Sequence, residues 1–207
     1  MRNRKEEILT VALHLFARDG YEAVSVSQIA GELDMTKGAL YRHYKSKRDI
    51  FDCILERMEQ GDSERAAEYD MPEDDKASMP DQYKTVSLEE FVEYSKSMFA
   101  YWTEDDFASS FRKMLTIEQF RSEEMQGLYQ QYLSSGPAAY VKDLFESMGI
   151  AHAEENAVRF YATMYFYYSV YDGADDKKKV KNEFASAIGS MAQAWIMQPK
   201  LTQIRKS

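Results

Sequence analysis

A run of nine residues, 36–44, places several hydrogen-bond donors at the spacing of one helical face. The donors predicted to point outward are Lys37, Tyr41, Arg42 and His43. Leu40 and, one turn later, Tyr44 are predicted to point the other way, into an apolar core. Ammonium and guanidinium groups donate to phosphate or to guanine, and a tyrosine hydroxyl donates to phosphate. This pattern has the chemistry to contact a nucleic-acid backbone and to read base edges.

Residues on either side of the run support the same interpretation. Thr36 can cap a helix over 37–44 by accepting a hydrogen bond from an unpaired backbone N–H. Gly38 has no side chain and leaves room for a sugar–phosphate strand near the start of that helix. Lys47 begins the next helix, where its ammonium and the helix N-terminus could both meet a phosphate.

A second helix precedes the run. Ser25 and Gln28 have the capping-box spacing, in which each side chain satisfies a free backbone group at the helix start. Ala30 and Gly31 are small enough to let two helices approach closely. Asp34 tolerates the left-handed backbone of the tight turn that follows. The two helices together are predicted to form a helix-turn-helix, whose second helix enters the major groove of double-stranded DNA.

This helix-turn-helix, residues 25–44, resembles the DNA-binding signature of the TetR family of transcriptional regulators. The resemblance rests on Ser25-Val26-Ser27-Gln28-Ile29-Ala30, on Met35 to Lys47, and on the lead-in from Ile8 to Phe16 followed by Gly20-Tyr21. Its most specific part is a Lys-Gly-x-Leu-Tyr-x-His core with a lysine four residues beyond the histidine. The chain departs from the family at Asp34, where glycine is usual, and at Tyr44, where phenylalanine is usual.

The resemblance implies an all-helical homodimer whose divergent C-terminal domain binds a small-molecule inducer, and it favours repression over activation. Transferred by motif position, the residues that would face DNA are Ser25, Thr36, Lys37, Gly38, Tyr41, His43 and Lys47. Arg42 stands at a variable position that would read bases. Taken singly, Tyr41 is more often a packing residue and His43 a surface or capping residue. The interpretation therefore rests on the whole set.

Charge is distributed unevenly along the chain. The 207 residues carry a net charge of −9, yet through Arg48 nine Lys and Arg oppose six Asp and Glu. The remainder holds 17 basic and 29 acidic residues, which phosphate would repel. The basic side chains are thus concentrated where the helix-turn-helix is predicted.

Helical spacing of apolar residues runs through almost the whole chain, which predicts an all-α fold. A first helix is expected over about 3–18, and a long fourth helix, capped by Ser46, over about 47–65. Residues 66–86 are rich in acidic residues and include two prolines, which indicates an exposed linker. Further helices are expected from a capping box at Ser87 and over about 105–116, 118–134, 137–148, 153–171 and 176–197. Gly136 and Pro137 are expected to separate two of them, and Gly149 to end the next.

Two domains are predicted from this order. Residues 1–47 would form the three-helix DNA-binding domain with its helix-turn-helix. Residues 48–207 would form a helical domain for effector binding and dimerisation.

The helix over 153–171 is apolar or aromatic on nearly every side, which indicates burial on every side. One side can face its own domain, and another would face a second copy of the chain. The next helix carries a strip of small residues that permits close helix approach. The predicted dimer residues are Tyr167, Tyr171, Phe184, Ala185, Ile188, Gly189, Ala192 and Trp195. Two such helices from each subunit would form the interface that a two-fold DNA site requires.

The C-terminal region is also rich in aromatic and methionine side chains, which suit a pocket for a bulky apolar or aromatic effector. The predicted ligand-binding residues are Met98, Tyr101, Trp102, Met114, Tyr161, Met164, Tyr165 and Tyr168. For each of them, packing in an ordinary core is the alternative. A cavity within 87–197 would favour the ligand interpretation, whereas a filled core would favour a regulator governed by a partner protein.

Several classes of protein are excluded by what the sequence lacks. It has no Gly-rich phosphate loop, His-Glu-x-x-His, Gly-x-Ser-x-Gly or paired-cysteine site, so no enzyme, cofactor or metal site is expected. His14 and His152 have no partners at ligand spacing. Cys53 lies on the apolar side of a helix and is expected to be a small buried hydrophobe rather than a redox sensor. No segment resembles a membrane span or a signal peptide, and a cytoplasmic location is expected.

Overall fold

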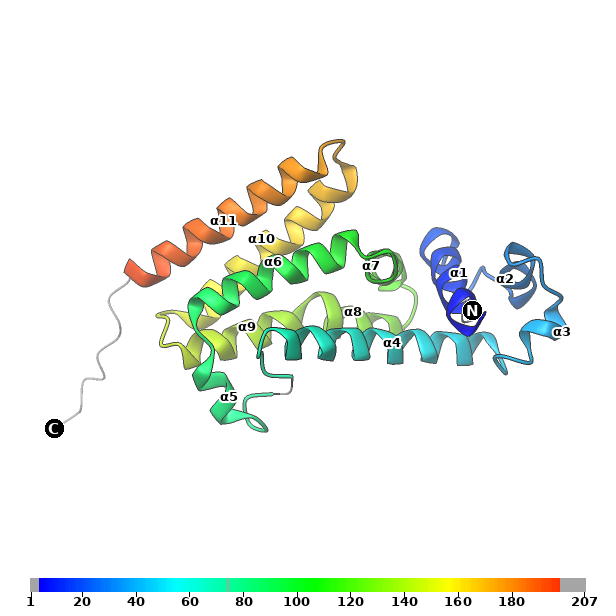
Figure 1. Ribbon diagram of the computed structural model, residues 1–207, viewed down its shortest axis with the longest axis horizontal. Coiled ribbons are helices and arrows are strands. Elements are labelled where there is room, and N and C mark those ends of the chain that lie inside the picture. Colours follow the sequence, from blue (N-terminus) through cyan, green and yellow to red (C-terminus); the bar gives the residue numbers. More distant parts are fainter. Residues whose placement is uncertain (1–3, 74, 198–207) are drawn as a thin grey trace. The chain divides into compact units, whose positions relative to one another are not determined.

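The computed structural model of the chain describes residues 4–73 and 75–197, and within these ranges it contains helices and no strands. In chain order the helices are α1 (Arg4–Asp19), α2 (Val26–Glu32), α3 (Lys37–Leu40), α4 (Lys47–Glu68), α5 (Pro80–Thr85), α6 (Leu88–Glu104), α7 (Asp106–Glu118), α8 (Glu123–Leu133), α9 (Ser135–Ser147), α10 (Ala153–Gly173) and α11 (Lys177–Met197) (Figure 1). The all-α prediction is confirmed. The predicted first residue of α1, Asn3, lies outside the described residues.

The helices group into two compact units that do not follow the order of the chain. The N-terminal unit combines residues up to Glu64 with Glu104–Gln130, and the C-terminal unit combines Arg65–Thr103 with residues from Gln131 onward. Helix α4 continues without a break across the predicted boundary at residue 47. That residue 47 separates a DNA-binding domain from an effector-binding domain stays a prediction.

The N-terminal unit is built around α1. Ile8, Leu13 and Phe16 of α1 are fully buried, and α1 packs against both α2 and α7. After α1 the chain turns at Gly20, whose φ of 90° is strained for residues with a side chain. The ring of the next residue, Tyr21, lies with its centroid 5.0 Å from that of Phe16 and 5.0 Å from that of Phe51 on α4. The core of this unit therefore joins helices from distant parts of the sequence.

The C-terminal unit has an aromatic core. Helix α10 packs against α9 and, as an antiparallel pair, against α11 (Figure 1). Phe184 of α11 stacks on Phe99 of α6 with centroids 4.2 Å apart. The ring of Trp195, also on α11, has its centroid 4.5 Å from that of Phe145 on α9. Aromatic side chains thus fill the space between the four helices.

The predicted linker over 66–86 was wrong. Helix α4 extends to Glu68, and α5 forms a further helix that packs against α9. Met71 and Tyr83 are buried, and the Tyr140 hydroxyl donates a hydrogen bond to the carbonyl of Pro72 at 3.0 Å. A few buried apolar side chains hold the segment while its described acidic residues remain exposed, so average composition was a poor guide to its structure.

The predicted break between two helices is present, but it lies at Ser134 rather than at Gly136 and Pro137. Helix α8 ends at Leu133 and α9 begins at Ser135, so both residues lie in the first turn of α9. A Cβ atom at position 136 would overlap the carbonyl oxygen of Gln131 and lie 3.2 Å from its Cα. Glycine is required here because the two helices meet backbone to backbone. Gly149, with a φ of 73°, does follow the end of α9 as expected.

Gly136→Ala is expected to destabilise the fold by about 2 kcal/mol, because backbone must move to admit the methyl group. Gly127→Ala is the matched control, since that glycine lies inside α8 with open space around it. Alanine at 127 should stabilise the helix by roughly 0.5–1 kcal/mol. Urea unfolding measures both changes in the free energy of unfolding, and equal effects of the two substitutions would contradict the close approach.

Candidate nucleic-acid interface

Helix α2 begins with the predicted capping box. The Ser25 hydroxyl accepts a hydrogen bond from the Gln28 backbone N–H at 3.2 Å. The Gln28 side-chain oxygen accepts in return from the Ser25 N–H at 2.7 Å. Ile29 and Ala30 on the inner side of α2 are buried. These local bonds satisfy helix-start groups and set where α2 begins.

The turn after α2 has the geometry expected for a helix-turn-helix. Asp34 adopts a left-handed backbone with φ of 51°, as predicted for this position. The Thr36 hydroxyl then caps α3 by accepting from the Ala39 N–H at 3.1 Å. Aspartate tolerates positive φ better than most residues, although glycine would carry less strain.

Helix α3 is shorter than the predicted helix over 37–44. After Leu40 two backbone N–H groups bond three residues back instead of four, from Arg42 to Ala39 at 3.3 Å and from His43 to Leu40 at 2.8 Å, whereas those of Tyr41 and Tyr44 still bond four residues back. Such bonds tighten the last turn of a helix. The side chains of residues 41–43 are therefore presented from a tightened turn that follows α3.

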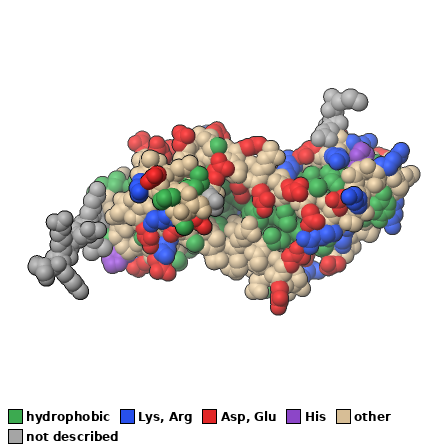
Figure 2. Space-filling view, turned by 90° about the horizontal axis from the view of Figure 1, so that it is seen from below, with side chains coloured by type: hydrophobic (Ala, Val, Ile, Leu, Met, Phe, Trp, Pro, Cys, Tyr) green, Lys and Arg blue, Asp and Glu red, His purple; other side chains and the backbone are tan. Residues whose placement is uncertain are grey.

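Seven of the eight predicted DNA-facing residues lie at the start of α2, on α3 with its cap, or in this turn, and Lys47 begins α4. The exposed members are Ser25, Thr36, Lys37, Gly38, Tyr41 and Arg42, whereas His43 and Lys47 are half-buried. Tyr41 is 43% exposed although it is aromatic. In Figure 2, blue Lys and Arg side chains are scattered over the surface of the unit that carries α1–α3. Contact of these residues with DNA stays a prediction.

The inner side of α3 follows the prediction. Leu40 is fully buried, and the Tyr44 ring is buried with its hydroxyl donating to the Lys5 carbonyl at 3.2 Å. Burial raises the pKa of Tyr44 to about 12, because the phenolate would lose its hydration. The hydroxyl thus ties the end of the recognition segment to the start of α1.

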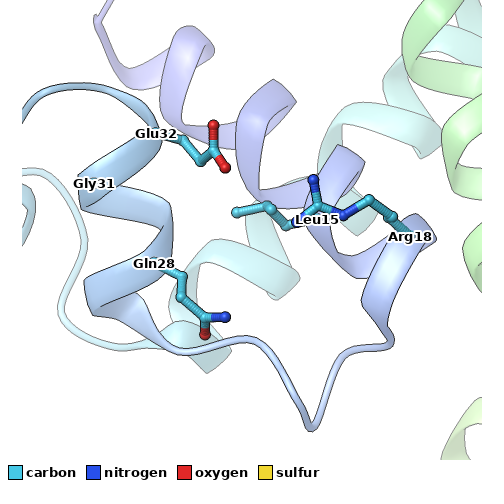
Figure 3. A pocket seen from close by; sticks show the side chains of 5 residues that line it. All are labelled: Leu15, Arg18, Gln28, Gly31 and Glu32. Atoms are coloured by element: carbon cyan, nitrogen blue, oxygen red, sulfur yellow. The ribbon is translucent and has the colours of Figure 1, made fainter.

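The expected close approach at Gly31 was wrong. Gly31 is exposed, and no atom lies within 4 Å of where its Cβ would be. It instead lines an open pocket of about 390 Å³ between α1 and α2 with Leu15, Arg18, Gln28 and Glu32 (Figure 3). Ala30, which is buried, is the small residue at the helix contact.

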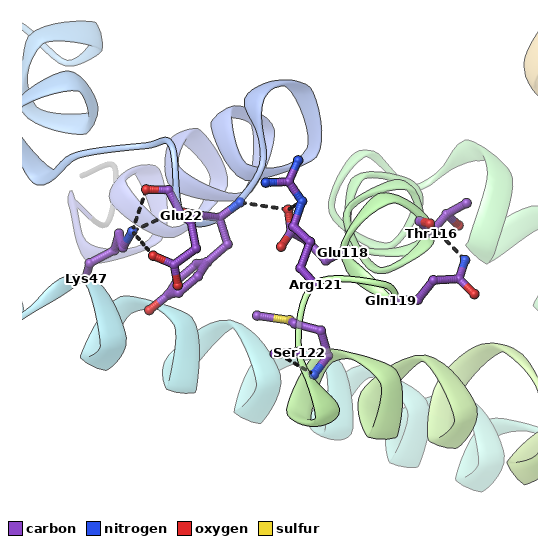
Figure 4. Close-up of polar contacts among 9 residues, drawn as sticks. Glu22, Lys47, Thr116, Glu118, Gln119, Arg121 and Ser122 are labelled. Atoms are coloured by element: carbon purple, nitrogen blue, oxygen red, sulfur yellow. Dashed lines mark hydrogen bonds and ion pairs between the residues drawn. The ribbon is translucent and has the colours of Figure 1, made fainter.

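Lys47 has intramolecular partners that the sequence did not indicate. Its ammonium donates to the carbonyl of Tyr21 at 2.8 Å and lies 3.4 Å from that of Glu22 (Figure 4). The same group lies 4.3 Å from the centroid of the Tyr21 ring. The side chain is only 21% exposed. Lys47 therefore fixes the loop between α1 and α2 to the start of α4, whatever else it contacts.

Glu118 at the end of α7 meets the same loop from the other side. Its carboxylate is 1% exposed and accepts a hydrogen bond from the Tyr21 N–H at 3.1 Å. The Arg121 guanidinium lies 3.3 Å from the same oxygen (Figure 4). Sequence reasoning missed this residue, since 97 positions separate the partners and no local motif marks it.

Residues 8–54 match the sequence pattern of the family described as bacterial regulatory proteins, tetR family. The chain carries a TetR-family DNA-binding domain. It is 40% identical over 65 residues to the HTH-type transcriptional regulator AcrR of Shigella flexneri, covering 31% of this chain and 30% of that protein. It is 41% identical over 59 residues to the nucleoid occlusion factor SlmA of Escherichia coli O1:K1, covering 28% and 30%. The chain thus matches about a third of the length of these curated relatives.

Beyond the TetR-family domain, the likeness lies in the fold. A TetR/AcrR-family transcriptional regulator from Aquifex aeolicus VF5 aligns with a TM-score of 0.68 at 18% identity, over 90% of this chain and 98% of that one. A SmeT–triclosan complex aligns with a TM-score of 0.67 at 14% identity, over 96% and 94%. The helical C-terminal unit therefore has the architecture of these regulators while its sequence has diverged.

The family matched by residues 8–54 is described as regulatory proteins and not as enzymes. Within the described ranges, no three His, Cys, Asp or Glu residues gather as metal ligands would. No helix in the described part of the chain is both long and apolar enough to cross a membrane. Cys53, beside the TetR-family recognition segment, is half-buried, and burial raises the pKa of its thiol, which disfavours the reactive thiolate.

The predicted ligand-binding residues are mostly buried but do not all share one unit. Tyr101, Trp102, Tyr161, Met164 and Tyr168 are buried in the C-terminal unit, and Met98 and Tyr165 there are half-buried. Met114 is buried in the unit that carries the TetR-family domain. A pocket of about 340 Å³ in the C-terminal unit is lined by other residues, among them Val86, Leu88, Met148 and Trp195.

The predicted dimer residues divide into two groups. Tyr171, Phe184, Ile188, Ala192 and Trp195 are already buried within a single chain, so they offer little surface to a second copy. Tyr167, Ala185 and Gly189 are half-buried. Exposed large apolar side chains on these two helices are Val158 (56% exposed) and Phe166 (61%) of α10 and Ile196 (73%) and Met197 (82%) of α11, none of which was among the predicted dimer residues.

Proposed function

We propose that the protein is a transcription regulator, in the simplest case a cytoplasmic repressor, that binds a palindromic DNA operator as a homodimer. The observation that carries the proposal is the exposed set of donors on α3 and the turn after it. Lys37, Tyr41 and Arg42 project from a segment whose start is capped by Thr36 and whose inner side is buried through Leu40. Such preorganisation lets phosphate contacts set the register while Arg42 reads a base.

The dimer is proposed to form through α10 and α11. Val158, Ala162 and Phe166 are exposed and recur every four residues, which makes one apolar stripe along α10. The half-buried Ala185 and Gly189 of α11 add small residues that permit close packing. A two-fold dimer would place its two recognition segments about 34–36 Å apart, in successive major grooves.

The effector is proposed to be a small apolar or aromatic molecule bound in the C-terminal unit. Its core is lined with tyrosine, tryptophan and methionine side chains, which adapt to such ligands. SmeT, which has this fold, is described in complex with triclosan. Binding of the effector would favour a conformation of the dimer that no longer fits successive grooves, and would thus lower operator affinity.

Selection from a random DNA library tests the function directly. The protein is expected to select a palindrome, and Arg42→Ala should lose about 1–3 kcal/mol of base preference at one position in each half-site. Arg159→Ala is the matched control, because it removes the same charge from exposed α10 and should leave base preference unchanged. Addition of triclosan as a probe to the selected complex reports on the effector. Failure to select any sequence would rule out the proposed function.

Phe166→Glu is expected to convert the dimer into a monomer, because a carboxylate would be buried at the interface. Phe120→Glu provides the control, since Phe120 is 88% exposed in the turn after α7 and belongs to the N-terminal unit rather than to α10. Sedimentation equilibrium should give twice 24.1 kDa for the wild type and for the Phe120 variant, and 24.1 kDa for the Phe166 variant. A monomeric wild type, or a dimeric Phe166 variant, would exclude this interface.

A further inference from the structure

We infer that Glu118, on α7, is a positioning residue for DNA binding although it lies outside the matched domain. It fixes the loop that holds Lys47, and through Lys47 it fixes the start of α4 next to the recognition segment. The inference rests on the proposed function and adds to it a route by which α7 controls the DNA-binding surface.

The contact of Glu118 with the loop is buried and specific. The carboxylate is 1% exposed and accepts a hydrogen bond from the Tyr21 N–H at 3.1 Å, and it forms an ion pair with the Arg121 guanidinium at 3.3 Å. A Cβ at Gly20 would lie 2.8 Å from the same carboxylate oxygen. The loop therefore approaches α7 as closely as it does because residue 20 is glycine. A buried carboxylate that lost the N–H would pay a large desolvation penalty, which makes this contact difficult to shift.

The Tyr21 peptide continues the connection toward DNA. Its N–H binds Glu118, and the carbonyl of the same residue accepts from the Lys47 ammonium at 2.8 Å (Figure 4). Lys47 is the first residue of α4, and only two residues separate it from Tyr44 at the end of the recognition segment. Displacement of α7 would therefore be carried to that segment through one residue of the loop.

Two further polar contacts, an ion pair and a histidine–carboxylate contact, join helices of this unit. The Arg48 guanidinium on α4 contacts Glu124 on α8 at 2.6 Å, and His14 on α1 contacts Asp106 on α7 at 2.8 Å. All four residues belong to the N-terminal unit, yet the chain continues into the C-terminal unit on either side of Glu104–Gln130. Helix α7 thus contacts the helices proposed to bind DNA through its side chains. It is joined to the C-terminal unit covalently, because α6 directly precedes it in the chain.

Positioning and simple electrostatics predict opposite signs for the loss of Glu118. Removal of a negative charge by itself raises affinity for phosphate. Loss of a positioning contact lowers affinity for the selected operator, because the donors of the recognition segment no longer match their base edges. The direction of the change therefore separates the two effects.

Glu118→Ala is expected to weaken binding to the selected operator about tenfold, the scale of one lost hydrogen bond to a charged group. Binding to DNA of unrelated sequence should stay unchanged or strengthen. Glu118→Gln should lose less, since its amide oxygen can still accept from the Tyr21 N–H. Glu123→Ala is the matched control, because it removes an exposed carboxylate at the start of α8. Fluorescence anisotropy titrations measure all four affinities, and operator binding by Glu118→Ala at or above the wild-type level would overturn the inference.

Hydrogen exchange of the free protein gives a second test that needs no DNA. In Glu118→Ala the amides of Tyr21 and of residues 25–44 should exchange faster, while those in the middle of α10 keep their rates. In Glu123→Ala all of these rates should remain those of the wild type. Unchanged exchange at Tyr21 in Glu118→Ala would overturn the positioning role even if operator affinity fell. A wild type without sequence preference would instead refute the proposed function, and the exchange rates would still decide the role of Glu118.

Discussion

The peptide group of Tyr21 is bound on both sides by charged side chains that are largely removed from water. The buried carboxylate of Glu118 accepts from its N–H, and the ammonium of Lys47 donates to its carbonyl. Charged groups with little access to solvent must be satisfied by the protein, or the cost is several kcal/mol. This constraint brings three helices together, namely α1 through the loop that follows it, α4 and α7. The arrangement of the proposed DNA-binding surface depends on it.

The size of the helix-turn-helix region explains why a distant helix takes part. About fifty residues bury too small a fraction of their surface for a comfortable stability. In this chain α7 packs along α1 and contributes the fully buried Phe111. The recognition segment therefore belongs to a larger compact unit than the matched residues 8–54. Because α7 is needed for the stability of that unit, a displacement of α7 would also change the structure around the recognition segment. Such a displacement is a physical route by which DNA binding could be regulated.

Local features were predictable from the sequence because their causes are local. The capping box at Ser25, the cap at Thr36 and the left-handed Asp34 depend on residues a few positions apart. The close approach at Gly31, the length of the recognition helix and the linker over 66–86 were predicted wrongly. In each of these three cases tertiary packing or hydrogen bonding determined the structure. Neither the composition of a segment nor the presence of one small residue predicts such contacts.

The same limit applies to the aromatic helices at the end of the chain. Phe184 and Trp195 were predicted to lie at the interface with a second copy of the chain, because periodicity does not tell which neighbour covers an apolar side chain. The structure packs them against Phe99 and Phe145 of the same chain. Glu118 is the extreme case, since its role depends on one contact across 97 positions. Contacts of this kind depend on the topology of the fold, so local sequence motifs do not predict them.

The central claim is that Glu118 and Lys47 act as one unit through the peptide group of Tyr21. A double-mutant cycle with Glu118→Ala and Lys47→Ala, read in the free energy of unfolding by urea, tests it most directly. The two side chains have the loop in common, so the cycle should give an interaction energy between about 0.5 and 3 kcal/mol. Effects that add to within roughly 0.3 kcal/mol would show that the residues act independently, and would contradict the account.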